Sequence, residues 1–120
     1  MSTRADAERI AAALEHLDAM HRHLAQGDIR ENVIADAVSM RLLAAITAVH
    51  DGDPALGQRL FSTEWRDIWG MRNRIAHGYL TTDPVIIRST VSNDVPAFER
   101  ALREELAMLH RSSREDRSAP

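Results

Sequence analysis

Four long segments of this chain carry apolar side chains at helical spacing, and none alternates with the period of a strand. A helix with one apolar stripe must bury that stripe against another element, so four such helices predict an all-α, antiparallel four-helix bundle. The stripes are Ile10, Leu14, Leu17 and Leu24; Ile34, Val38, Leu42, Ala45 and Val49; Trp65, Ile68, Trp69, Ile75 and Ala76; and Ile87, Val91, Val95, Phe98, Leu102 and Leu106.

Helix starts are marked by acidic residues just before the stripes, because a carboxylate can accept the first backbone N–H groups of a helix. Such pairs are Asp28 with Glu31 before the second stripe, Asp53 with Pro54 before a short extra helix that ends near Phe61, and Asp83 with Pro84 before the last stripe. Pro96 falls inside the last stripe, so we expect a kink or a restart near Asn93 and Asp94.

Length and composition predict one domain over residues 1–110 and a polar, disordered tail over residues 111–120. The absence of cysteine excludes disulfides and thiolate metal sites.

All fifteen basic residues are arginine, against eighteen acids, for a formal charge of −3. An RNA ligand would therefore need a local arginine patch. The charged N-terminal segment resembles neither a secretory signal nor a membrane span, which predicts a soluble cytoplasmic protein without membrane contact.

The segment MRNRIAHGY, residues 71–79, gathers polar groups at the end of the third predicted long helix. Gly78 suits the left-handed residue that follows many helices, so this helix should end at or next to His77. At about 100° per residue, Arg72 lies in the middle of the apolar stripe, whereas Asn73 and His77 stack along its margin. A charge on an apolar face is costly unless it is paired or lies in a cleft. Arg72 therefore needs a carboxylate partner or a functional pocket.

Two structural interpretations stay open beside a functional one. In the first, His77 caps the helix, Tyr79 makes the accompanying hydrophobic contact and the Arg72 stem lies along the surface. In the second, the chain is a structural dimerisation bundle in which Arg72 pairs with an acid such as Asp36 or Asp94. A buried, fully paired Arg72 with His77 pointing to solvent would favour the second interpretation.

Residues 65–93, WRDIWGMRNRIAHGYLTTDPVIIRSTVSN, resemble the signature region of the HepT-like branch of the HEPN superfamily. The motif of that branch is arginine, four residues, histidine, one residue and tyrosine, which here are Arg72, His77 and Tyr79, with Asn73 directly after the arginine. The resemblance implies an HEPN-type four-helix bundle, to which this chain adds a short helix and a kinked last helix.

One pair of positions departs from the family pattern. Many members carry a Gly-Glu pair in the second long helix, where this chain has Ile46 and Thr47. Any role of that glutamate is therefore not transferred to this chain.

The resemblance implies a metal-independent ribonuclease that acts on tRNA or mRNA and needs no cofactor. Such a reaction needs a base for the 2′-hydroxyl, an acid for the leaving 5′-oxygen and positive charge on the phosphorane. His77 is the candidate acid or base, Arg72 the candidate stabiliser, and Asn73 would hydrogen-bond substrate or orient the histidine. One motif offers one histidine for two proton roles. A homodimer with its active site near the interface would supply both, and a 2′,3′-cyclic phosphate product is expected.

The resemblance also implies a partner. In HepT-like toxins, the motif tyrosine accepts AMP groups from a MntA-type nucleotidyltransferase antitoxin, which makes Tyr79 the expected AMPylation site. Added phosphates beside the catalytic groups would repel RNA. The alternative is a non-catalytic HEPN-type module that binds a nucleotide or a nucleotidyltransferase partner.

A metal site has weak support in the sequence. His16, His21 and His23 cluster in the first predicted helix, but only His16 and His23 share a face, and no acidic or thiol partner stands at ligand spacing. We therefore predict no metal ligands.

Overall fold

The computed structural model describes residues 3–78 and 83–118, and this part of the chain consists of helices without a strand. The helices are α1 (Thr3–Gln26), α2 (Asn32–His50), α3 (Ala55–Phe61), α4 (Glu64–Ala76), α5 (Pro84–Asn93) and α6 (Val95–Ser118). The predicted all-α fold is confirmed, including the short extra helix α3 and the division of the last helix into α5 and α6.

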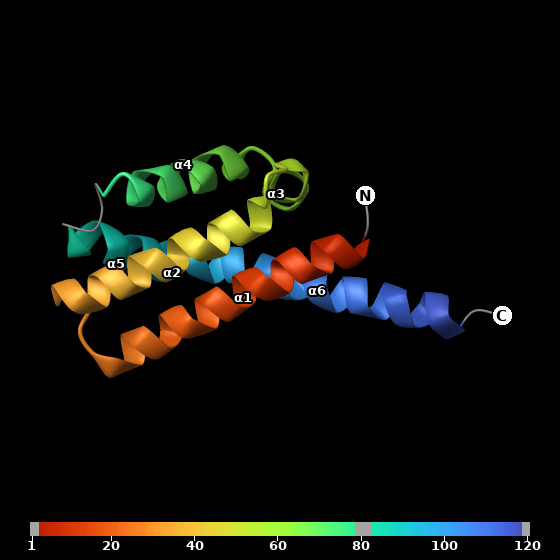
Figure 1. Ribbon diagram of the computed structural model, residues 1–120, viewed down its shortest axis with the longest axis horizontal. Coiled ribbons are helices and arrows are strands. Elements are labelled where there is room, and N and C mark those ends of the chain that lie inside the picture. Colours follow the sequence, from red (N-terminus) through yellow and green to blue (C-terminus); the bar gives the residue numbers. More distant parts are fainter. Residues whose placement is uncertain (1–2, 79–82, 119–120) are drawn as a thin grey trace.

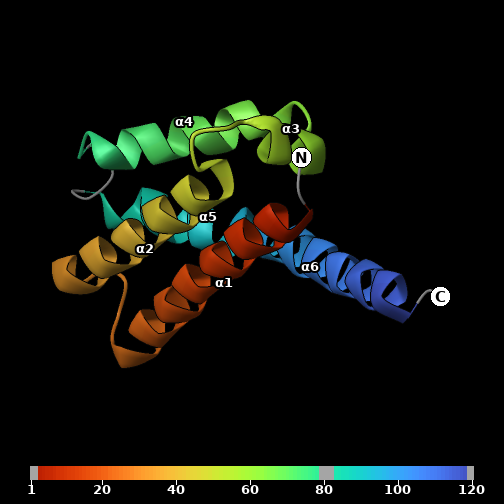
Figure 2. The same cartoon turned by 45° about the vertical axis from the view of Figure 1, so that its right-hand side comes forward.

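The helices form a bundle around α2 (Figure 1). Helices α1 and α2 make an antiparallel hairpin, α6 packs along α1, and α4 lies on α2 with the short α3 at its start. Figure 2 shows α4 on one side of α2 and α1 on the other, while the far half of α6 projects beyond the bundle. The order of the helices therefore brings α4 against the last turns of α2.

Three helix boundaries follow their predicted signals. The Asp83 carboxylate accepts the backbone N–H of Val85 at 3.0 Å, with Pro84 at the first helical position of α5. The Asp53 carboxylate accepts the N–H of Ala55 at 3.0 Å at the start of α3. The last helix restarts at Asp94, which places Pro96 in the first turn of α6, where its missing N–H costs nothing.

The predicted capping box of Asp28 and Glu31 forms only in part: the Asp28 backbone N–H donates to Glu31 Oε1 at 3.3 Å, but Asp28 does not cap α2. Helix α2 begins at Asn32 with Glu31 as its N-cap, and the Asp28 carboxylate instead binds the Arg30 guanidinium at 2.6 Å and the Arg30 backbone N–H at 2.8 Å. These bonds to Arg30 lower the pKa of Asp28 to about 2. The ion pair of Asp28 with Arg30, two residues further along the chain, has thus replaced the predicted cap of α2.

The C-terminal segment also differs from its prediction. A disordered tail is expected from Arg111, whereas α6 continues as helix to Ser118, with exposed side chains over residues 111–116. Neither glycine nor proline occurs between Pro96 and Pro120, so no residue in this stretch ends the helix.

The core contains almost all of the predicted stripe residues, with Ile10, Leu17, Val38, Val49, Ile87 and Leu102 fully buried. Two acids are also buried, Asp6 and Glu105, and both bind the Arg59 guanidinium at 3.2 and 2.8 Å. The bond from Glu105 is the main reason why the pKa of Arg59 is raised. This ion cluster joins α1, α3 and α6.

The apolar composition of α2 reflects its central place. By length and hydropathy this helix could cross a membrane, which differs from the expectation that the chain has no such segment. It contacts α1, α3, α4 and α5, and its buried residues form much of the core. Core packing explains its composition.

Candidate functional site

The motif helix α4 ends where the sequence predicts. His77 is the C-cap residue, and its backbone N–H donates to the Asn73 carbonyl at 3.1 Å. Gly78 has a φ of 80°, the left-handed conformation, and its N–H donates to the Ile75 carbonyl at 2.9 Å. A side chain at position 78 would strain this turn. Tyr79 lies outside the described residues.

Arg72 points from α4 toward α2 and is half-buried there. Its Nε–H donates to the Thr47 hydroxyl at 3.1 Å, and Nη1 donates to the Asn73 side-chain carbonyl at 3.2 Å. The guanidinium carbon lies 4.9 Å from the centroid of the Trp69 ring, a cation–π contact. All three partners are electrically neutral. Arg72 thus lies between α4 and α2, and none of these three partners neutralises its charge.

The structural interpretation that pairs Arg72 with an acid is not supported by the structure. In the described part of the chain, no carboxylate oxygen lies within 4.0 Å of the Arg72 guanidinium, although eight other ion-pair contacts meet that limit. Asp94, one of the two expected partners, is the C-cap residue of α5 and lines a groove with residues of α4 among which Arg72 is not found.

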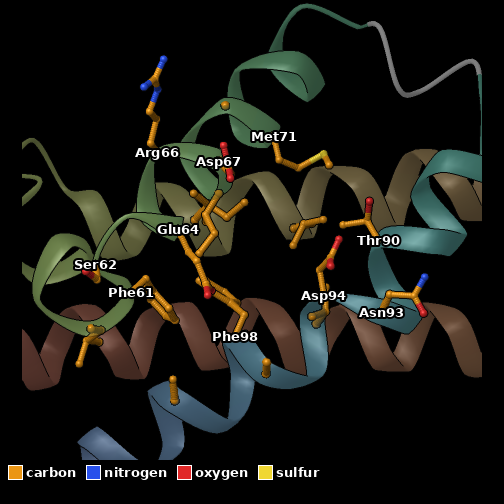
Figure 3. A pocket seen from close by; sticks show the side chains of 18 of the residues that line it. Phe61, Ser62, Glu64, Arg66, Asp67, Met71, Thr90, Asn93, Asp94 and Phe98 are labelled. Atoms are coloured by element: carbon orange, nitrogen blue, oxygen red, sulfur yellow. The ribbon is translucent and has the colours of Figure 1, made fainter.

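That groove lies between α4 and the junction of α5 with α6 and has a volume of about 1030 Å³ (Figure 3). Phe61, Met71, Thr90 and Phe98 are among its lining residues. Arg72, Asn73 and His77 are not in its lining. This groove is therefore separate from Arg72, Asn73 and His77.

A column of aromatic rings runs from the core to the Arg72 side of α4. Phe98 stacks on Phe61, Phe61 on Trp65, and Trp69 on His50, with Trp65 and Trp69 tilted against each other. The His50–Trp69 centroid distance is 4.2 Å. Both rings line a smaller hollow of about 650 Å³ on this side of the helix. The Trp69 ring of this column lies beneath the Arg72 guanidinium.

Asn73 and His77 are exposed at the same end of α4, as predicted from their spacing. Asn73 Oδ1 accepts a hydrogen bond from Arg72, so this amide is bonded to the arginine side chain. Ala76, expected on the apolar stripe, is exposed as well. The last turn of α4 thus presents an amide that is bonded to Arg72 and, one turn further along, an exposed imidazole.

Two contact residues on α2 were not identified as site residues from the sequence. Thr47 was considered only as a departure from the family pattern, and His50 was not considered. Thr47 and His50 lie one turn apart on α2, and Trp69 and Arg72 lie one turn apart on α4. Thr47 therefore meets Arg72, and His50 meets Trp69. That matched spacing was the available signal, but it needed the antiparallel pairing of these helices to be known.

The histidines of α1 serve other contacts. His16 Nδ1 lies 3.0 Å from Arg41 Nη1, and His21 Nε2 lies 2.7 Å from Glu99. The two rings thus face different helices, α2 and α6, and take no part in the motif site.

The family model described as ribonuclease HepT-like matches residues 10–105 of this chain. Neither the comparison with curated proteins nor the comparison with solved structures gives a match. The matched region covers most of the bundle and the whole of α4, with Arg72, Asn73 and His77. The chain therefore belongs to the HepT-like ribonuclease family.

Proposed function

We propose that this protein is the toxin component of a HepT/MntA-type toxin–antitoxin system and acts in the cytoplasm as a metal-independent ribonuclease on tRNA or mRNA. The observation that carries the proposal is the set of contacts that the Arg72 guanidinium makes. The guanidinium contacts a hydroxyl, an amide and an indole, and His77 is exposed at the end of the same helix. A partly buried cation with only neutral partners is suited to an anionic ligand, such as a phosphodiester.

The chemistry assigns one role to each group. A histidine takes the proton from the 2′-hydroxyl, and the O2′–P bond forms as the P–O5′ bond breaks. A second histidine gives its proton to the leaving 5′-oxygen, and the products are a 2′,3′-cyclic phosphate and a 5′-hydroxyl end. Arg72 stabilises the charge of the phosphorane through its η nitrogens, and Asn73 helps to hold the guanidinium.

The need for two histidines leads us to propose a homodimer with the active site near its interface. Val33 and Met40 on α2 are 78% and 57% exposed and so are available for contact with a second chain. They precede Thr47 at intervals of seven residues and so lie on the same stripe of α2 as the Arg72 contact. A second chain that covered this stripe would bring its own His77 close to the first.

Cleavage in the presence of a chelator tests this function. We expect the protein, expressed without a partner, to cut end-labelled tRNA or mRNA in EDTA, and the fragments to end in a 2′,3′-cyclic phosphate, which mass spectrometry separates from a linear phosphate by one water. Inactivity of the folded, unmodified protein on both RNAs would instead favour the non-catalytic module that binds a nucleotide or a nucleotidyltransferase.

We further propose that Tyr79 is the site of inhibition. A MntA-like nucleotidyltransferase would transfer AMP from ATP to the tyrosine oxygen with release of pyrophosphate, and the added phosphates would repel RNA beside Arg72. Co-expression with such a partner should raise the intact mass by one or more AMP units and abolish cleavage, whereas Tyr79→Phe should keep its mass and its activity. An unchanged wild-type mass would contradict the assignment.

A further inference from the structure

The contacts of Arg72 differ from those of the arginines that form close ion pairs, and in the described part of the chain it shares the lack of a carboxylate partner with Arg41, whose Nη1 lies 3.0 Å from His16 Nδ1. Arg30, Arg59 and Arg103 each bind at least one carboxylate. Arg72 instead binds Thr47, Asn73 and Trp69. A carboxylate would hold the guanidinium more strongly, but it would also neutralise the charge. A hydroxyl fixes the position of the guanidinium and leaves the charge available.

The Thr47 hydroxyl has a fixed direction. Its O–H donates to the Leu43 carbonyl one turn earlier in α2, at 2.8 Å, so its lone pairs remain to accept the Arg72 Nε–H. Because a hydrogen bond at Nε constrains the plane of the guanidinium, this contact orients the whole group. Among the described residues, the hydrogen bonds of the guanidinium are made by Nε and Nη1.

A second contact supports the first from one turn away. Trp69, over which the guanidinium lies, stacks on His50 with an interplanar angle of 20°. His50 is held in turn, because its Nδ1 accepts the Gly52 backbone N–H at 3.0 Å. Two cross-helix contacts, Thr47 with Arg72 and His50 with Trp69, therefore fix α4 against α2 at the site.

We propose that Thr47 is a positioning residue of the ribonuclease site, whose hydroxyl orients the Arg72 guanidinium toward the scissile phosphate while leaving its charge intact. This inference rests on the proposed function. Thr47 touches no substrate and acts through Arg72 alone.

The test compares Thr47→Val, which keeps the shape and removes the hydroxyl, with Thr47→Ser, which keeps the hydroxyl. We expect Thr47→Val to lower kcat about tenfold with little change in KM, and Thr47→Ser to restore most of the activity. Thr90→Val is the matched control, because the Thr90 hydroxyl also donates to a carbonyl one turn earlier, at 3.0 Å, but no arginine is bonded to it. This variant should keep the wild-type kcat.

A double-mutant cycle separates positioning from a structural role. If Thr47 acts through Arg72, Thr47→Val should cost nothing further in the Arg72→Lys background, whereas a general loss of stability would add to the effect of Arg72→Lys. Additive losses, or a Thr47→Val enzyme as active as wild type, would overturn the proposal.

A readout without catalysis distinguishes this proposal from the proposed function. In ¹⁵N NMR spectra, the Arg72 Nε–H, assigned by its loss in Arg72→Lys, should exchange slowly with water in the wild type and fast in Thr47→Val. If the wild type cleaves no RNA, the proposed function fails and the catalytic role of Thr47 fails with it, whatever the NMR shows. If the wild type cleaves RNA but the Nε–H signal is the same in both proteins, only the positioning role is overturned.

Discussion

Replacement of His77 with alanine is expected to lower kcat for RNA cleavage by about 10²- to 10⁴-fold, the usual contribution of a general acid or base. The imidazole lies at the exposed end of α4, and alanine keeps the backbone N–H of position 77 that donates to the Asn73 carbonyl. RNA binding and the melting temperature should therefore change little. The measurement is the initial cleavage rate at saturating RNA, in chelator, with the melting curve of each protein.

His110→Ala is the matched control, since His110 is an exposed histidine on the far half of α6. It should cleave RNA at the wild-type rate, which would show that the loss belongs to position 77. A His77→Ala protein as active as wild type would remove the proposed mechanism. Mixed dimers offer a further check. If each chain supplies one histidine, chains with His77→Ala mixed with wild-type chains should lower activity more than in proportion to their share.

The fold was largely predictable because its signals are local. The cap at Asp83 and the left-handed Gly78 each depend on residues within one turn, and the sequence supplies those residues. Pro96 likewise marks the break between α5 and α6. The failure at Asp28 has the same origin. Arg30 competes for its carboxylate at a distance of two residues, and the spacing rule for a capping box takes no account of that competitor.

The site was predictable only along its own helix. Helical geometry placed Arg72 on the inner face and His77 on the exposed margin, and the structure agrees with both. The α2 partners of Arg72 and Trp69 depend on the position of α4 along α2. That position is set by the packing of large rings such as Trp65. A Cβ on Gly57 would lie 2.3 Å from that ring, so the approach of α3 also requires a glycine. Long-range packing of this kind leaves no periodic signal in a single sequence.

Arg72→Lys is expected to lower kcat/KM by about 10²- to 10³-fold, equivalent to about 2.7–4 kcal/mol of transition-state stabilisation. Lysine keeps the positive charge but lacks the planar fork that bridges two phosphate oxygens, and it has no Nε–H to donate to Thr47. The loss should appear mainly in kcat, because an ammonium can still attract RNA in the ground state. Cleavage rates as a function of RNA concentration give both constants.

Arg74→Lys serves as the control for the general effect of exchanging arginine for lysine on α4. Arg74 is exposed on the same helix two residues away and lies beside the groove, not at the seam with α2. It should keep kcat and KM within about twofold of wild type, the size of effect typical for an exposed substitution. An Arg72→Lys enzyme with wild-type kcat would show that positive charge alone is enough. The neutral contacts with Thr47, Asn73 and Trp69 would then serve the packing of α4 on α2 and not the transition state.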